Sequence, residues 1–314
     1  MSVFWGDKRY YSINYHLKSR YGQRVQNIPI DAGFTCPNRD GAIGVGGCIF
    51  CSQKGSGDLA ESREMSITQQ VNSRIERLSS RGINKYIVYF QAYTNTYAPV
   101  EVLRQKYYEA IADERVVGLA IGTRPDCIDA EKVRLFSEIA EKKDIWIELG
   151  LQSIFDQTAK FMNRGYKLDC FDRAVRLLHQ NNIKTVVHLI FGLPHETKEM
   201  MIDSVRYISE KGISGVKFHL LHILKNTRLQ ELYSAGGFKL LEKDEYVEIV
   251  VNALENLAPD IVVHRLTAEA PREILVAPDW CLKKRGLLNS IERTLAERNT
   301  WQGRLLKSSA RGYD

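Results

Sequence analysis

Residues 36–51 have the sequence Cys36-Pro37-Asn38-Arg39-Asp40-Gly41-Ala42-Ile43-Gly44-Val45-Gly46-Gly47-Cys48-Ile49-Phe50-Cys51. A β-strand is expected just before this stretch. A structural zinc site normally has four protein ligands, and an iron-sulfur cluster held only by protein also has four. Three thiolates in one turn-rich loop therefore indicate an iron-sulfur cluster in which one iron has no protein ligand. Such an iron is a place where another molecule can bind.

Two other interpretations of the cysteine loop stay open. Zinc is one of them, because a fourth ligand could come from His16, Cys127, Cys170 or Cys281. A disulfide is less favoured, because no secretory leader opens the sequence and no apolar run reaches about 18 residues. We therefore expect a soluble cytoplasmic protein without a membrane segment, in a compartment that keeps thiols reduced. The spacing favours iron-sulfur over zinc.

The composition permits a full hydrophobic core and a nucleic-acid partner but requires neither a particular fold nor RNA. The chain has 314 residues, of which 44% are hydrophobic and 26% are charged, enough for one large domain or one domain with a small appendage. Its net charge of +6 is mild, and many soluble enzymes carry a similar excess on solvated faces.

Short β-rich runs alternate with helical patterns along the first two thirds of the chain. The expected strands are residues 27–31, 86–90, 116–121, 145–149, 185–191 and 215–221. Repeated βα units predict a parallel sheet with helices packed outside it. Six units are too few for a closed eight-stranded barrel, which leaves an open sheet or an incomplete barrel. Both place chemistry at the carboxyl ends of the strands, where the cysteine loop lies.

The cysteine loop resembles a variant of the signature of the radical S-adenosylmethionine (SAM) superfamily, in which three cysteines hold a 4Fe-4S cluster and SAM binds the fourth iron. The commonest spacing there is C-x3-C-x2-C, whereas eleven residues separate Cys36 from Cys48 here. A lengthened gap resembles the branch that contains the catalytic subunit of Elongator. The resemblance implies Cys36, Cys48 and Cys51 as cluster ligands, and Phe50 stands where relatives usually have an aromatic residue near SAM.

The same resemblance sharpens the fold to the α/β partial (βα)6 TIM-like barrel of radical SAM enzymes with a mostly helical C-terminal extension. We expect residues 1–225 to form the barrel and its N-terminal extension, and residues 226–314 to form the C-terminal extension. The His264-Arg265-Leu266 run and the turn at Pro271 resemble the extension that Elongator-type enzymes append to the barrel.

Polar residues after the second and third expected strands are candidates for contacts to SAM. Gln91 and Thr94 follow the second strand, where most relatives carry a Gly-Gly-Glu-like motif from which this sequence departs. Arg124 belongs to a Gly-Thr-Arg-Pro turn that resembles one in Elongator-like enzymes. The alternatives are an ordinary polar turn and a surface arginine.

The fourth strand and the loop after it carry the most specific motifs of this branch. Residues 148–153 resemble its Glu-Leu-Gly-x-Gln-Ser motif, which implies that Glu148, Gln152 and Ser153 lie near SAM. Arg164 lies in an Asn-Arg-Gly run that resembles one in the same branch. A carboxylate inside an apolar strand needs a partner, so the alternative for Glu148 is a salt bridge within the barrel.

Histidines and a lysine in the last two expected strands are weaker candidates. Lys217 and His219 alternate along the sixth strand, so if their face is the barrel interior they meet the substrate and are candidate catalytic residues. A half-buried edge strand is the alternative. His188 and His195 are expected to be core or rim residues, without a catalytic role.

The C-terminal tail is basic and contains aromatic residues. Its cations are Lys283, Lys284, Arg285, Arg293, Arg298, Arg304, Lys307 and Arg311, with Trp280 and Trp301 among them. Cations beside aromatic rings can follow a phosphate backbone and stack on unpaired bases, although a solvated helix would look similar. Lys8, Arg9 and Arg20 form a second small basic patch with neighbouring tyrosines.

These features together imply a radical SAM enzyme that cleaves SAM reductively and acts on tRNA, at the carbon-5 substituent of a wobble uridine. The expected reaction converts carboxymethylaminomethyl to aminomethyl during 5-methylaminomethyl-2-thiouridine synthesis, with flavodoxin or ferredoxin as electron donor. Acetyl transfer is not expected, because no room for Elongator's acetyltransferase domain remains before Asp314. The rival hypotheses are a radical SAM enzyme for a small or porphyrinogen-like molecule and a zinc-containing RNA-binding protein without catalysis.

Overall fold

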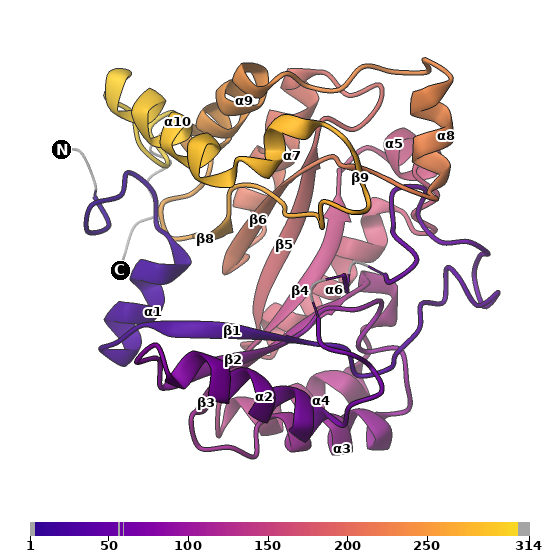
Figure 1. Ribbon diagram of the computed structural model, residues 1–314, viewed down its shortest axis with the longest axis vertical. Coiled ribbons are helices and arrows are strands. Elements are labelled where there is room, and N and C mark those ends of the chain that lie inside the picture. The colour runs from indigo at the N-terminus through magenta and orange to yellow at the C-terminus, as the bar shows by residue number, and fades with distance from the viewer. Residues whose placement is uncertain (1–3, 56, 59, 307–314) are drawn as a thin grey trace.

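The computed structural model describes residues 4–55, 57–58 and 60–306, so Lys307 and Arg311 of the basic tail lie outside the described residues. Seven strands form one parallel sheet in the order β1-β2-β3-β4-β5-β6-β8 (Figure 1). The strands are β1 (Val25–Ile30), β2 (Lys85–Phe90), β3 (Val116–Thr123), β4 (Asp144–Gln152), β5 (Lys184–Phe191), β6 (Gly215–Leu220) and β8 (Val262–Arg265). The predicted parallel α/β architecture is confirmed, with one strand more than the six expected βα units.

Helices follow the first five strands and cover the outer face of the sheet. They are α2 (Ile67–Ser79), α3 (Val100–Ala110), α4 (Ala130–Ala140), α5 (Asp156–Phe161), α6 (Leu168–Gln180) and α7 (Lys198–Ser209), with a 3-10 turn, η1 (Pro125–Cys127), before α4. Helix α2 begins at a capping box, in which Ser66 and Gln69 each satisfy the other's backbone N–H. In Figure 1, α2, α3 and α4 lie beside one another along the outside of the sheet.

The seventh strand comes from the segment that the sequence places in the C-terminal extension. Strand β8 pairs with β6 in parallel, with Lys217 opposite Arg265. The N-terminal segment reaches the same edge, because Val263 donates its N–H to the carbonyl of Tyr11 at 2.7 Å. Helix α1 (Ile13–Tyr21) also packs here. Both terminal segments therefore meet at β8 and extend the barrel wall.

The remaining elements form the helical region above this edge. They are β7 (Ile223–Leu224), α8 (Arg228–Ser234), α9 (Lys243–Glu255), β9 (Leu275–Ala277), η2 (Asp279–Leu282) and α10 (Lys284–Glu297). Strands β7 and β9 form a two-stranded antiparallel sheet, and α10 packs on α9 (Figure 1). Within the described part of the chain, no helix is long and apolar enough to cross a membrane.

The inner face of the sheet changes from apolar to polar along the strands. Ile87, Trp146 and Val186 form an apolar cluster near the amino ends, and Leu17 of α1 packs against it. Because side chains alternate between the two faces of a strand, the next inward residues of β4 and β5 are Glu148 and His188. Helix α1 thus closes one end of the interior, and the polar end opens toward the carboxyl ends of the strands.

Candidate functional site

A cavity of about 290 Å³ lies at the carboxyl ends of the strands. Cys36, Cys48 and Cys51 line it from the loop after β1, and Arg265 and residues 268–271 line it from the region of β8. Strands β1 and β8 are the two opposite edges of the sheet. Since both edges border one cavity, the sheet is curled into a half-barrel around it.

The long gap between the first two cysteines is a folded structure. Within residues 37–47, Asp40 and Val45 form an antiparallel bridge, and the N–H of Ile43 donates to the carbonyl of Pro37 at 2.9 Å. These contacts close a small hairpin, so the eleven intervening residues fix the position of the second and third cysteines relative to the first.

A pair of asparagines joins this hairpin to the loop after α5. Asn38 donates its side-chain amide to the carbonyl of Asn163 at 2.6 Å, and Asn163 donates its amide to the carbonyl of Gly47 at 2.8 Å. The Asn38 amide also lies 3.8 Å from the Sγ of Cys48. Burial raises the pKa of Cys48 to about 12, so its thiol keeps the proton unless a metal displaces it.

The donor set fits a cluster better than a single metal ion. All six cysteines are free thiols. Among the described residues, no three Cys, His, Asp or Glu side chains are close enough to share one ion, whereas the three thiolates of a 4Fe-4S cluster bind three different irons and stand further apart. The proposed fourth zinc ligands, His16, Cys127, Cys170 and Cys281, do not line the cavity.

Beside the cysteines, a buried ion pair forms the floor of the cavity. Glu148, which is 1% exposed, pairs with Lys217, which is 3% exposed. Oε2 of Glu148 also lies 2.9 Å from Nε2 of His188. Burial opposes ionisation of Glu148, but Lys217 and His188 hold its pKa well below the ordinary value. Burial lowers the pKa of Lys217 to about 8 despite Glu148, so both groups are charged at neutral pH.

Three histidines line the wall of the cavity next to this pair. Burial lowers the pKa of His188 and His219, and lowers that of His222 to about 4, so all three rings are neutral at neutral pH. The rings of His188 and His219 lie 5.0 Å apart. Within the described residues, the buried Nε2 atoms of His219 and His222 have no hydrogen-bond partner, which leaves them available to a ligand.

The end of β4 bulges toward the cavity. The register with β5 shifts between Gly150 and Gln152, and Gln152 has a φ of 63°. A non-glycine residue in this conformation is strained, and such residues are common at ligand sites. A Cβ at position 150 would lie 2.5 Å from Nε2 of Gln152. The glycine therefore permits the conformation that places the Gln152 side chain on the cavity wall.

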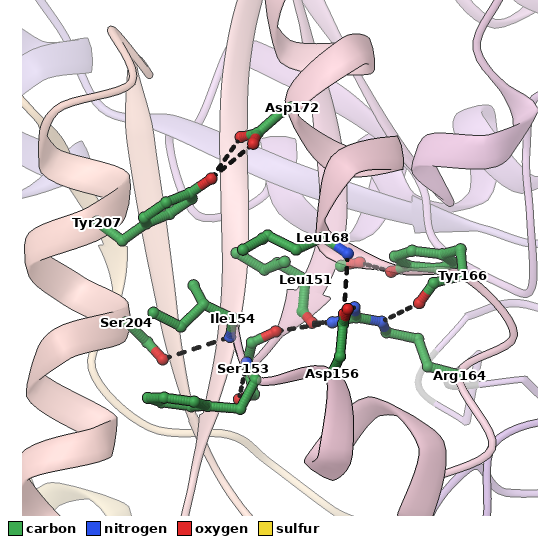
Figure 2. Close-up of polar contacts among 12 residues, drawn as sticks. Leu151, Ser153, Ile154, Asp156, Arg164, Tyr166, Leu168, Asp172, Ser204 and Tyr207 are labelled. Carbon is green, nitrogen blue, oxygen red and sulfur yellow. Dashed lines mark hydrogen bonds and ion pairs between the residues drawn. The ribbon is translucent and has the colours of Figure 1, made fainter.

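Arg164 holds this bulge from behind, as Figure 2 shows. Its guanidinium donates to the carbonyls of Leu151 and Ser153 at 2.6 and 2.7 Å and to that of Tyr166 at 3.1 Å. The residue is only 1% exposed. Three charge-assisted hydrogen bonds to backbone oxygens fix the conformation of the strand end.

Arg124 also lies over the ring of Tyr166. It forms a bidentate pair with Asp126 at 2.9 and 2.7 Å and donates to the carbonyl of Arg164 at 2.9 Å. Both guanidinium groups lie over the ring of Tyr166, at 4.9 and 4.5 Å from its centroid. The two arginines and the tyrosine form one group of contacts that connects the ends of β3 and β4.

The structure brings most of the predicted site residues to one cavity. Its lining includes the three cysteines together with Phe50, Gln91, Thr94, Arg124, Glu148, Gln152, Arg164 and His219. Ser153 and Lys217 do not line it. Ser153 donates its hydroxyl to Glu196 in the loop after β5, and Lys217 lies behind Glu148. Glu148 therefore makes the salt bridge that the sequence left as the alternative, and it also faces the cavity.

Sequence reasoning did not nominate several lining residues, among them Tyr89, His188, His222 and Arg265. Tyr89 and His188 each lie two residues after an inward-facing apolar residue, Ile87 in β2 and Val186 in β5. Because side chains alternate between the two faces of a strand, counting every second residue along these strands could have placed both in the interior. Arg265 had no such signal, because its strand was not expected to join the barrel.

The basic tail is largely neutralised by local ion pairs. Lys284 pairs with Glu269, Arg298 with Glu248, and Arg293 with Glu297. Lys8 of the N-terminal patch pairs with Glu292 of α10 at 2.8 Å. Within the described residues, Lys283 and Arg285 form no ion pair.

The two predicted basic patches are neighbours in space. Arg9 donates to the side chain of Asn299 and to the carbonyl of Thr300 at 3.3 Å each, and the N–H of Tyr11 donates to Gln302 at 2.8 Å. The N-terminal patch and the tail after α10 therefore belong to one surface.

Comparison with known proteins agrees with this geometry. The family model of the radical SAM superfamily matches residues 36–208, and that of the radical SAM C-terminal domain matches residues 213–297. Protein YtqA of Bacillus subtilis is 39% identical over 302 residues, which cover 96% of this chain and 94% of that protein. A tRNA uridine(34) acetyltransferase of Methanocaldococcus infernus is 26% identical over 168 residues, 52% of this chain and 31% of that protein.

Among solved structures, N-terminally truncated Elp3 from Methanocaldococcus infernus has the same fold, with a TM-score of 0.69 and 18% identity. The match covers 88% of this chain and 64% of that one. The family models together span the barrel and the C-terminal region, and YtqA is similar along nearly the whole chain. The chain therefore belongs to the radical SAM superfamily, and it is an enzyme whose cofactors are a 4Fe-4S cluster and S-adenosylmethionine.

Proposed function

We propose that this enzyme modifies tRNA at the carbon-5 side chain of the wobble uridine, converting carboxymethylaminomethyl to aminomethyl during 5-methylaminomethyl-2-thiouridine synthesis. The carboxymethyl unit would be oxidised by two electrons at its C–N bond, with SAM as the oxidant, and would leave as glyoxylate when water hydrolyses the resulting C=N bond. The observation that carries the proposal is the similarity, over 168 residues, to a protein named as a tRNA uridine(34) acetyltransferase. That segment covers about half of this chain and less than a third of the relative, so the substrate class is carried over and the acetyl transfer is not.

The cavity supplies positions for both cofactors. Cys36, Cys48 and Cys51 would hold the cluster, and Gln91 and Gln152 are polar residues on the wall that could contact SAM. When bound, the cluster would supply the electron for reductive cleavage of SAM, the chemistry that starts removal of a hydrogen atom from the substrate. A site of this kind must exclude water and reactive side chains.

The side chains around the cavity are suited to such a site because several of them are already paired or neutral. Glu148 is already paired with Lys217 and His188, and His219 and His222 are neutral. These parts of the wall can therefore hydrogen-bond to a ligand without supplying an uncompensated charge beside the reacting atoms. The Arg164 clamp keeps Gln152 in its strained, inward conformation.

The surface formed by the N-terminal patch, α10 and the residues that flank α10 is the proposed tRNA contact. Most of its cations are paired, so the net attraction to phosphate rests on residues such as Lys283 and Arg285, which have no ion pair within the described part of the chain. Phosphate contacts position a nucleic acid and are weakened by salt. We place the activity in the cytoplasm, with flavodoxin or ferredoxin as the reductant.

Mass spectrometry of wobble nucleosides tests the proposal. In tRNA from a strain that lacks this protein, carboxymethylaminomethyl uridine should accumulate and the aminomethyl product should disappear. The purified holoenzyme, with SAM and reductant, should convert that tRNA in vitro, and the K283E/R285E double variant should convert it with a raised KM. An unchanged nucleoside profile would reject tRNA and favour a small-molecule substrate, whose turnover the double variant should leave intact.

A further inference from the structure

The charged side chains that line the cavity have partners, with one exception. The partnered residues are Arg39, Asp58, Arg124, Glu148, Arg164 and Glu269. Arg265 lines the same cavity from the end of β8, yet no ion pair or hydrogen bond joins its guanidinium to any residue that the structure describes. A half-buried guanidinium without an acceptor bears a desolvation cost that an anion would remove.

Neutral hydrogen-bonding groups lie on the same wall. His219 and His222 come from β6 and the residues just after it, and β6 is the strand that pairs with β8. The Nε2 atom of each ring is buried and has no partner among the described residues, and His222 is only 9% exposed. Arg265 is among the charges that lower the pKa of both rings. Two residues with unsatisfied ring nitrogens therefore line the same cavity as the unpaired guanidinium.

We propose that Arg265, His219 and His222 form a subsite for one carboxylate group of the substrate. The subsite has one positive charge and two neutral imidazoles, so it matches a monoanion. A guanidinium binds a carboxylate through two parallel hydrogen bonds, and a neutral imidazole can donate through Nε2 once its tautomer is set by the ligand. Such an anion would satisfy all three groups at once.

The subsite would recognise the substrate of the proposed function, and its assignment to tRNA rests on that proposal. A carboxymethylaminomethyl group ends in a carboxylate, whereas the aminomethyl product has none. The unpaired arginine would therefore favour the substrate over the product, because binding the product leaves the guanidinium without an acceptor again. Arg265 is thus a specificity-determining residue, and its position on β8 explains what the seventh strand contributes to the site.

Binding measurements on the anaerobic holoenzyme with SAM and without reductant test the subsite. Wild type should bind tRNA that carries carboxymethylaminomethyl uridine roughly tenfold more tightly than the same tRNA carrying aminomethyl uridine. Arg265→Gln should abolish that preference, and Arg265→Lys should restore part of it, because Lys keeps the charge without the fork. Arg272→Gln is the matched control, since Arg272 is exposed beside the cavity lining and should leave the preference unchanged.

A second arm does not depend on tRNA. Calorimetric titration of the holoenzyme with sodium acetate should show saturable binding to wild type, none with acetamide, and none to Arg265→Gln. If acetate binds in this way but no tRNA is converted, the tRNA proposal fails and the subsite stands.

Three results would overturn the subsite. The first is a wild type that does not bind acetate. The second is an equal effect of Arg272→Gln and Arg265→Gln on tRNA preference, because general attraction to phosphate would then explain it. The third is a loss of substrate-free SAM cleavage in Arg265→Gln that parallels the loss of tRNA preference, because the carboxylate bound by Arg265 would then be that of SAM.

Discussion

The buried pair of Glu148 and Lys217 allows a sharp test of how the cavity floor is held. Glu148→Gln removes one charge and keeps the size of the side chain. Lys217 is then left as a cation that is 3% exposed, with the ring of Tyr89 at 4.1 Å as its remaining neighbour among the contacts described. Removing one partner of a buried ion pair typically costs about 3–5 kcal/mol.

The expected effect is measured as a loss of thermal stability. At about 2 °C or more per kcal/mol for a protein of this size, Glu148→Gln should lower the anaerobic melting midpoint of the holoenzyme by roughly 6–10 °C. Lys217→Met should have a similar effect, because it leaves Glu148 unpaired apart from His188. The double variant should be less impaired than either single variant, since no buried charge is then without its partner.

The control is Glu269→Gln, which breaks the exposed pair with Lys284. An exposed pair contributes about 0–1 kcal/mol, so the midpoint should barely move. The reasoning is refuted if the effects of Glu148→Gln and Lys217→Met simply add in the double variant, or if each costs no more than the control.

Three further variants test the cysteine loop, the hydrogen bonds of Arg164 to the end of β4, and the lowered pKa of Lys217. Gly44→Ala would place a Cβ 2.4 Å from Oδ1 of Asn38 and should lower iron content after reconstitution, whereas Gly286→Ala, where a Cβ meets nothing within 4 Å, should not. Arg164→Lys cannot keep the hydrogen bonds to all three carbonyls and should cost about 3 kcal/mol in unfolding free energy, with less SAM bound. Burial lowers the pKa of Lys217 to about 8 from 10.5, so between these pH values the unfolded chain binds more protons and the Lys217 contribution makes stability rise with pH. Lys217→Met should flatten that rise in melting midpoints, and an unchanged slope would contradict the lowered pKa.

The elements of the barrel could be predicted because each has a local signal. The β-branched runs around Ile87, Val187 and Val216 alternate with amphipathic helices, and the capping box at Ser66 marks where α2 begins. The curl of the sheet had no such signal. It depends on β8, a four-residue strand that pairs with β6 from 40 or more residues away in the sequence, and periodicity does not report partners at that distance.

In the candidate site too, residues in local motifs could be predicted, whereas contacts between distant parts of the chain could not. The three cysteines and Glu148 stand in motifs with recognisable spacing, so sequence alone could nominate them. Arg164 lines the cavity, and its nomination as a SAM contact stays a prediction. Its hydrogen bonds to the backbone carbonyls of the bulge could not be predicted, because a motif states which residue is present and not which partners it finds. The interpretation of the basic tail omitted Glu248 and Glu269, whose ion pairs form only in the folded chain.

The division of the chain into a barrel and a C-terminal extension at residue 225 stays a prediction. Strand β8 lies beyond that boundary and pairs within the barrel sheet, while α9 and α10 pack on each other above it. The C-terminal region therefore contributes to the cavity wall through Arg265 and residues 268–271.

The most direct test of the central claim is the amount of 5′-deoxyadenosine that the anaerobically reconstituted protein forms from SAM and dithionite. The wild type should bind iron and sulfide as a 4Fe-4S cluster and form 5′-deoxyadenosine, and so should Cys170→Ala, which alters a cysteine away from the cavity lining. Alanine at Cys36, Cys48 or Cys51 should abolish it. A wild type that is loaded with the cluster and forms no 5′-deoxyadenosine, or a Cys36→Ala variant that still forms it, would contradict the account.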